Sequence, residues 1–244
     1  MRDWSHGYIE YALDFVAGGL YEEAAGLLGL YLQDVEKVYP IIYYLLGYIC
    51  MKQSNPSLAQ EYFVKAEKCD SAYCFPNRIE EVLILQEAVR RNPSDAKSFY
   101  YLGNFWYASR RYENAVSCWE QSATIDPEFP TVWRNLSLAY YNKCNNREKA
   151  VAALEKAFAL DNTDARILME LDQLYKKLGR SYAERLTFLE KHVALVESRD
   201  DLALERITLY NQLGRYSEAK ALLAARKFHP WEGGEGKVTG QYVL

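Results

Sequence analysis

Histidine and cysteine most often carry metal-binding or nucleophilic chemistry, and both are sparse and scattered in this sequence. The three histidines, His6, His192 and His229, lie far apart, and none belongs to an HExxH motif or has a cysteine at ligand spacing. The five cysteines form no CxxC pair: Cys50, Cys69, Cys74, Cys118 and Cys144. We therefore expect no metal site and no cofactor, and we interpret the cysteines as reduced, packed side chains.

Paired carboxylates can act as general acid and base, and the sequence has three such pairs, at 22–23, 80–81 and 200–201. Each pair stands at the expected start or on the polar face of a helix, where charge–dipole stabilisation accounts for it without catalysis. The sequence also has no GxGxxG after a strand, no P-loop and no GxSxG motif. We predict that this chain is not an enzyme.

Charge and hydropathy argue against a nucleic-acid-binding protein, a membrane protein and a secreted protein. The 244 residues carry 29 Lys or Arg and 33 Asp or Glu, a formal net charge of −4, which disfavours nucleic-acid and anionic-lipid partners. The longest uncharged run, residues 38–51, is shorter than the ~20 residues of a membrane span, so we expect no membrane segment. The first four residues lack the apolar core of a signal peptide, and scattered cysteines fit a reducing compartment. We therefore expect a cytoplasmic protein.

The strongest signal is an internal repeat of 34 or 35 residues. Apolar residues spaced i, i+3 and i+7 predict one buried face on the first helix of each unit. Small residues allow the second helix to approach closely, and we expect Trp119 to fill the gap between successive units. The slots around residue 100 are Phe99, Leu102, Gly103, Trp106, Ala115 and Trp119, and their downstream counterparts include Trp133, Leu136, Ser137, Tyr140 and Ala150.

This pattern resembles the tetratricopeptide repeat, a helix–turn–helix unit of about 34 residues. The resemblance covers residues 5–226. It implies an all-α, right-handed α-solenoid of six or seven helical hairpins, with repeats 1–2 in residues 5–70 and repeats 4–7 in residues 96–226.

The third unit, residues 71–95, is incomplete. Gly47 and Gly103 are 56 residues apart, 22 more than one repeat. Residues 78–91 match a second helix alone, and the short segment 71–77 replaces the first, so we expect the superhelix to kink or change pitch here. The unit around residues 186–197 is also degenerate, with the charged Lys191 where alanine is preferred.

Residues 227–244 follow the last repeat. Pro230 and two adjacent glycines predict a loop over residues 228–236, and residues 237–244 look like the first turns of another helix, so we expect a fragment of a longer protein. We predict that Phe228 and Trp231 fold back and cap the last helix pair near Leu209, Leu213 and Leu222. A flexible linker is the alternative.

A finer resemblance concerns residues 73–79, 164–177 and 226–243. These segments are similar to the repeat region of large bacterial proteins in which a carbohydrate-enzyme-like, β-rich domain precedes the repeats. The resemblance implies an alternative function, as a structural or oligomerisation arm of a carbohydrate-processing protein.

In stacked helical hairpins the first helices line a concave groove. Tyrosine combines a large apolar area with one hydroxyl and few rotors, which suits recognition of peptides. The leading prediction is therefore a non-catalytic scaffold that binds a peptide, a protein or a neighbouring domain, and homo-oligomerisation is left open. The alternative for many of the 21 tyrosines is that they fill bulky slots between repeats. The expected groove residues are Tyr44, Tyr48, Tyr100, Asn104, Tyr107, Arg134, Leu138 and Tyr141.

Chaperone-adaptor repeats hold an acidic tail with a carboxylate clamp, and Asn104, Asn135 and Arg166 fall in three of its five positions. Tyr100 and Glu170 occupy the other two, where the family has lysine or arginine. A missing cation and an added carboxylate should weaken binding of an acidic tail, so we do not predict this clamp.

Overall fold

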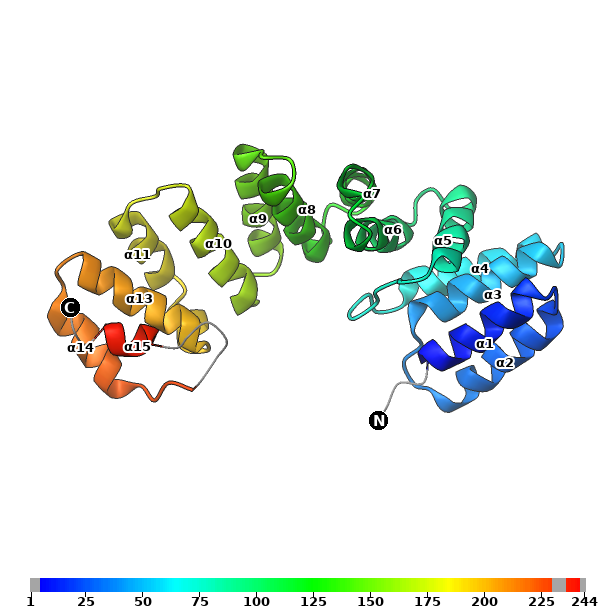
Figure 1. The fold of residues 1–244 in the computed structure, drawn as a ribbon, viewed down its shortest axis with the longest axis horizontal. Coiled ribbons are helices and arrows are strands. Elements are labelled where there is room, and N and C mark those ends of the chain that lie inside the picture. Colours follow the sequence, from blue (N-terminus) through cyan, green and yellow to red (C-terminus); the bar gives the residue numbers. More distant parts are fainter. Residues whose placement is uncertain (1–4, 230–235, 242–244) are drawn as a thin grey trace. The chain divides into compact units, whose positions relative to one another are not determined.

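The computed structural model describes residues 5–229 and 236–241, and every regular element in these ranges is a helix. The expected all-α repeat fold is confirmed. The chain divides into two compact units, Met1–Val132 and Trp133–Leu244, called the N-terminal unit and the C-terminal unit below (Figure 1).

The N-terminal unit consists of two hairpins, a single helix and a further hairpin. Proline at the first helical position, which needs no N–H donor, begins both α3 and α4. Asp95 caps α6 by accepting hydrogen bonds from the backbone N–H groups of Lys97 and Ser98. The helices are α1 (Ser5–Ala17), α2 (Tyr21–Asp34), α3 (Pro40–Lys52), α4 (Pro56–Lys68), α5 (Ile79–Arg91), α6 (Ala96–Ala108) and α7 (Tyr112–Ile125).

Glycine allows the two helices of a hairpin to touch. A Cβ atom added to Gly103 would lie 2.3 Å from Trp119 Cδ1, and one added to Gly47 would lie 2.4 Å from Phe63 Cε1. Both distances are far below van der Waals contact, so the aromatic ring of the second helix occupies the space that a side chain would need. The close approach that the sequence predicts at Gly103 is confirmed.

The third unit contains the single expected helix, α5, which follows α4 directly in the chain. α5 packs against α3 and α6, and the non-helical residues 69–78 stand in place of a first helix. Cys74, in the middle of this segment, is buried, and its burial raises the pKa of the thiol to about 12. The change of superhelix pitch expected at this point stays a prediction.

The C-terminal unit continues the hairpins. In the degenerate repeat around residues 186–197, the second helix is interrupted by a turn at Lys191 and His192. Lys191 is exposed, and the ring of His192 lies 4.9 Å from the ring of Phe158. The helices are α8 (Pro130–Asn142), which begins in the N-terminal unit, α9 (Arg147–Leu160), α10 (Ala165–Lys177), α11 (Tyr182–Glu190), α12 (Val193–Glu197), α13 (Asp200–Gln212), α14 (Tyr216–Ala225) and α15 (Lys237–Gly240).

The helical turn expected after the loop is present as α15. Phe228 is half-buried, and the guanidinium carbon of Arg226 lies 5.6 Å from the centre of its ring. Trp231 lies outside the described residues, so the capping of the last helix pair by this loop stays a prediction.

Candidate functional site

Two of the tyrosines expected in the groove are core residues. Tyr44 is fully buried and donates a hydrogen bond from its hydroxyl to Asp95 Oδ2 at 2.7 Å. Tyr100 is buried against Phe129, with their ring centroids 4.9 Å apart. The prediction that Tyr44 and Tyr100 face a groove is therefore wrong. α3 and α6 each pack against several helices, which buries the face beside the expected core face.

The other predicted residues of the N-terminal unit are half-buried. The Lys52 ammonium lies 5.0 Å from the centre of the Tyr48 ring. Asn104 Oδ1 accepts a hydrogen bond from Trp119 Nε1 at 3.2 Å, and the Tyr107 ring lies 5.3 Å from the Trp119 ring. Asn104 and Tyr107 thus help to close the α6–α7 hairpin, and a binding role for all three residues stays a prediction.

The predicted residues of α8 lie beside α10. Arg134 Nε donates to Glu170 Oε2 at 2.7 Å, and its Nη2 bonds to the other oxygen of the same carboxylate. The Lys177 ammonium lies 5.2 Å from the centre of the half-buried Tyr141 ring. Leu138, between them in sequence, is 50% exposed. This part of the expected groove is therefore a surface shared by two successive first helices.

The positions of α10 that are equivalent to these residues of α8 line a pocket that was not predicted from the sequence. Advancing Arg134, Leu138 and Tyr141 by 35 residues leads to Met169, Gln173 and Lys176 of α10. All three line a pocket of about 480 Å³ whose other walls belong to α13 and α15. The repeat length was the signal that could have located them. The remaining lining residues are Asp201, Leu204, Glu205 and Thr208 of α13 and Lys237, Gly240 and Gln241 of α15.

Two carboxylates of α13 stay charged in this pocket. Burial favours the neutral carboxyl of Glu205, but hydrogen bonds to Oε1 from Lys176 Nζ at 2.8 Å and Arg185 Nη2 at 2.6 Å outweigh it and lower the pKa. Burial likewise opposes ionisation of Asp201, and hydrogen bonds from Arg199 Nε and Nη2, at 3.0 and 2.6 Å, outweigh it and lower the pKa. Both groups are anionic at neutral pH.

A buried ion pair supports Glu205 from the interior. The fully buried Arg185 donates from Nε and Nη2 to the two oxygens of Asp172, at 3.0 and 2.6 Å. By the repeat register, Asp172 and Arg185 occupy the slots of Ser137 and Ala150 one repeat earlier. There the Ser137 hydroxyl donates to the Ala150 carbonyl oxygen at 2.7 Å. A contact between two small residues is thus replaced by a buried ion pair in the next repeat.

Acid should weaken the C-terminal unit through Glu205. A carboxyl whose pKa is lowered by folding stabilises the fold fully above its ordinary pKa of 4.5, and this contribution is lost as the pH falls through the folded-state pKa. We expect Glu205→Gln to cost about 1–3 kcal/mol in urea unfolding at neutral pH, and the difference from wild type to shrink below about pH 4.

Glu148→Gln, at an exposed carboxylate of α9, is the matched control and should change stability by less than about 0.5 kcal/mol at each pH. A stability difference between wild type and Glu205→Gln that stays constant down to about pH 3 would contradict the assigned role of the carboxylate.

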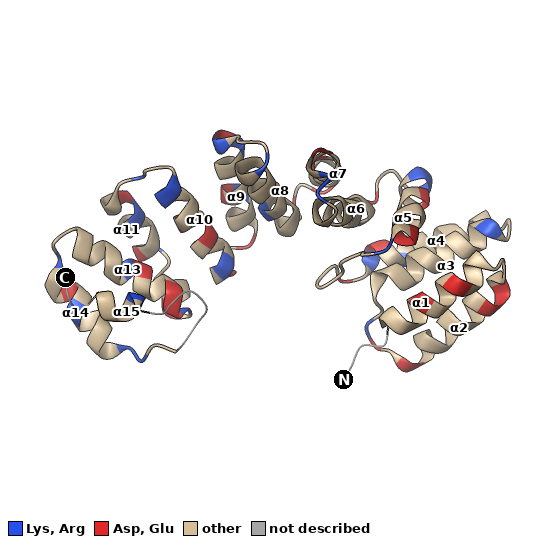
Figure 2. Cartoon of the chain, viewed as in Figure 1, with Lys and Arg blue, Asp and Glu red and all other residues tan. Residues whose placement is uncertain are grey.

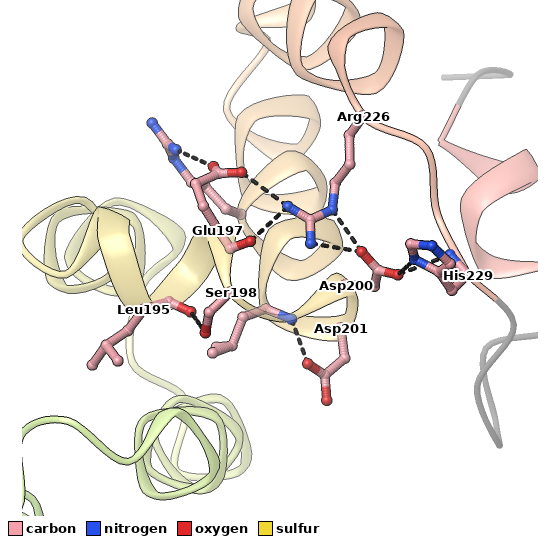
Figure 3. A network of polar contacts seen from close by, with 9 residues as sticks. Leu195, Glu197, Ser198, Asp200, Asp201, Arg226 and His229 are labelled. Atoms are coloured by element: carbon pink, nitrogen blue, oxygen red, sulfur yellow. Dashed lines mark hydrogen bonds and ion pairs between the residues drawn. The ribbon is translucent and has the colours of Figure 1, made fainter.

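Contacts at both ends of α13 hold the chain that follows α14, and Figure 3 shows those of Asp200. Asp200, the first residue of α13, accepts hydrogen bonds from Arg226 Nε at 2.7 Å and from the backbone N–H of His229 at 2.8 Å. Asn211, near the end of α13, donates from Nδ2 to the backbone oxygen of Gln241 at 3.1 Å. The chain beyond α14 is therefore tied to α13 on either side of the pocket.

The chemistry that the pocket offers is recognition by charge, amide and hydroxyl groups beside the apolar Met169 and Leu204. Within residues 5–229 and 236–241, no group of three or more His, Cys, Asp or Glu side chains is arranged to hold a metal ion. None of the helices in this part of the chain is long and apolar enough to span a membrane.

Comparison with known sequences supports the repeat assignment. The sequence model of the tetratricopeptide repeat matches residues 41–73 and 131–164. These two segments are similar to tetratricopeptide repeats. The tetratricopeptide repeat protein 37 of Xenopus laevis is 28% identical over 119 residues, which cover 47% of this chain and 7% of that protein. This chain therefore corresponds to a small part of the length of that relative.

A similar fold is found among solved structures. The pilF protein of Pseudomonas aeruginosa superposes with a TM-score of 0.50 at 19% identity, over 91% of this chain and 89% of that chain. A thermophilic tetratricopeptide-repeat protein of Thermus thermophilus has a TM-score of 0.45 and 20% identity, over 84% of this chain and 98% of that chain. At 19% identity, the likeness to pilF concerns the helical repeat fold alone.

Proposed function

We propose that this chain is a protein-interaction scaffold whose C-terminal unit binds an extended peptide in the pocket of α10, α13 and α15. Tetratricopeptide repeats generally mediate protein–protein interactions, and solenoids of this kind present concave binding surfaces. The main support for this proposal is that equivalent positions of two successive first helices, α10 and α13, line one pocket of about 480 Å³. This volume lies within the range of small-ligand sites and can hold a few residues of an extended chain.

The lining chemistry fits a peptide better than a uniformly charged ligand. Gln173 and Thr208 supply an amide and a hydroxyl for the peptide main chain, and Leu204 supplies apolar contact area. Both signs of charge are present, since Glu205 faces Lys176 at 2.8 Å. A polyanion such as nucleic acid would meet the carboxylates unfavourably, whereas a peptide can place side chains of either sign.

Selection of displayed peptides on the immobilised chain tests this proposal. We expect selected peptides to bind wild type and to lose about tenfold or more in affinity to Gln173→Arg/Thr208→Arg, because bulky cations would fill the pocket. Glu148→Arg, an exposed change on α9, is the control and should leave affinity unchanged. Enrichment of no peptide, or equal binding to the pocket variant, would contradict the proposal.

The alternative, an arm of a carbohydrate-processing protein, stays a prediction, as do the cytoplasmic location and homo-oligomerisation. The most direct observation for the alternative is the full open reading frame around this sequence. A β-rich domain upstream in the same frame is its expected result.

A further inference from the structure

The walls of the pocket of α10, α13 and α15 restrict the conformation that a bound peptide can take. Within the described residues of the C-terminal unit every regular element is a helix, so no strand edge is open to a ligand in the β conformation. Along the pocket, α10 and α13 pair their backbone N–H and C=O groups within the helix. The main chain of a bound peptide therefore finds no row of backbone partners.

The carboxylates of the pocket are already used as hydrogen-bond acceptors. Both oxygens of Asp201 accept from Arg199, and Glu205 Oε1 accepts from Lys176 and Arg185. A backbone N–H of a ligand would have to compete with these cations for an acceptor, and a buried N–H without an acceptor costs free energy. Proline is the residue that has no backbone N–H. The pocket chemistry therefore favours a ligand rich in proline.

The spacing of the walls selects a conformation. Met169 and Leu204 are 35 residues apart, as are Gln173 and Thr208, and all four line the pocket, so α10 and α13 present the same two positions one repeat apart. Side chains of these two helices are in direct contact, which corresponds to helix axes about 8–10 Å apart. In polyproline II, with three residues per turn, residues i and i+3 point the same way about 9 Å apart. In a β-strand, residues i and i+3 point to opposite sides.

We propose that the pocket binds a proline-rich segment in the polyproline II conformation, with prolines at i and i+3. This assignment rests on the proposed function, because it specifies the class of peptide that the pocket takes. The two proline rings pack against equivalent positions, one on Met169 of α10 and one on Leu204 and Thr208 of α13. The half-buried Gln173 amide donates to a main-chain carbonyl oxygen, which polyproline II leaves unpaired.

The charges around the pocket require no counter-ion from the ligand. Positive and negative residues both occur on α10 and α13 (Figure 2). Lys176 Nζ bonds to Glu205 Oε1 at 2.8 Å, and Arg199 bonds to both oxygens of Asp201. Because these carboxylates are matched by cations of the same chain, an uncharged peptide is a suitable probe.

Binding of two fluorescent peptides to the full chain tests the inference. Both consist of four prolines and six alanines, with proline at every third position in one, the i+3 peptide, and at every second position from the first residue in the other, the i+2 peptide. We expect the i+3 peptide to bind about tenfold or more tightly. Its all-D form, a polyproline helix of the opposite hand, should bind as weakly as the i+2 peptide.

Substitutions in the pocket locate the binding. Met169→Ala/Gln173→Ala should weaken the i+3 peptide at least about tenfold, because it removes the apolar contact and the amide donor on α10. Leu30→Ala, at an exposed leucine of α2 outside the pocket, is the control and should leave the affinity unchanged.

Three results would overturn the inference. One is equal affinity for the i+3 and i+2 peptides. Another is no binding of the i+3 peptide up to about 1 mM, the weak limit of specific association. The third is equal binding of the i+3 peptide to wild type and to Met169→Ala/Gln173→Ala, with both folded by circular dichroism.

The displayed-peptide selection separates this inference from the proposed function. Selected peptides that bind the pocket and carry prolines at i and i+3 support both. Selected peptides that bind the pocket without such prolines leave the peptide site in place and overturn the polyproline II assignment.

Discussion

Replacing Arg185 by methionine should destabilise the C-terminal unit by about 3–5 kcal/mol, because it leaves a buried carboxylate without its cation. Arg185 is 1% exposed and Asp172 is fully buried, so water cannot take over the lost hydrogen bonds. Glu205 would lose one of its two cations in the same change. The measurement is urea unfolding followed by circular dichroism at neutral pH, compared with wild type.

The matched control is Arg180→Met. Arg180 is an exposed cation whose guanidinium carbon lies 3.6 Å from the centre of the Tyr175 ring and which pairs with Glu155 at 3.3 Å. Exposed pairs of this kind contribute about 0–1 kcal/mol. Removing the orphaned charge as well, in Arg185→Met/Asp172→Asn, should recover a large part of the loss. If Arg185→Met and Arg180→Met lost the same free energy of unfolding, burial would not explain the contribution of the Arg185–Asp172 ion pair.

Adding one methyl group at Gly103 should destabilise the N-terminal unit by about 1–3 kcal/mol, although alanine favours helices more than glycine does. The new Cβ would lie 2.3 Å from two atoms of the Trp119 indole, so the ring must move. Trp119 Nε1 donates to the Tyr100 carbonyl at 3.3 Å and to Asn104 Oδ1 at 3.2 Å, and a shifted ring would weaken both hydrogen bonds. Thermal unfolding followed by tryptophan fluorescence reports the change.

Gly26→Ala is the control for intrinsic helix propensity. Gly26 lies within α2, and apart from its chain neighbours and the backbone of its own helix no atom lies within 4 Å of where a Cβ would be, so alanine should raise stability by up to about 1 kcal/mol. A double-mutant cycle with Trp119→Leu isolates the steric contact. Gly103→Ala should cost less in the leucine background, since the next repeat pairs the larger Ser137 with Leu154 in these slots. An equal cost in both backgrounds would contradict a clash with the indole.

The repeat period alone led to the helices and to their closest contacts. A period of 34 or 35 residues placed Gly103 against a second helix, and it located the single helix of the third unit. The period also predicts Trp119 between successive units, whereas its ring lies against Gly103 within the α6–α7 hairpin. These features follow from local geometry, because helical periodicity determines which residues share a face and small residues determine where backbones can meet. The same period, carried on from α8, would have led to Met169, Gln173 and Lys176 of the pocket.

The burial of individual side chains was decided by the tertiary structure. Tyr44 has the spacing of a groove residue, but its hydroxyl bonds to Asp95, which is 51 residues away in sequence. Asp172 and Arg185 each look like a surface charge, and only their proximity in the folded chain offsets the cost of burying them. Periodicity reports on one helix at a time. Whether a face is buried or open depends on how many neighbouring helices cover it, and these neighbours come from distant parts of the chain.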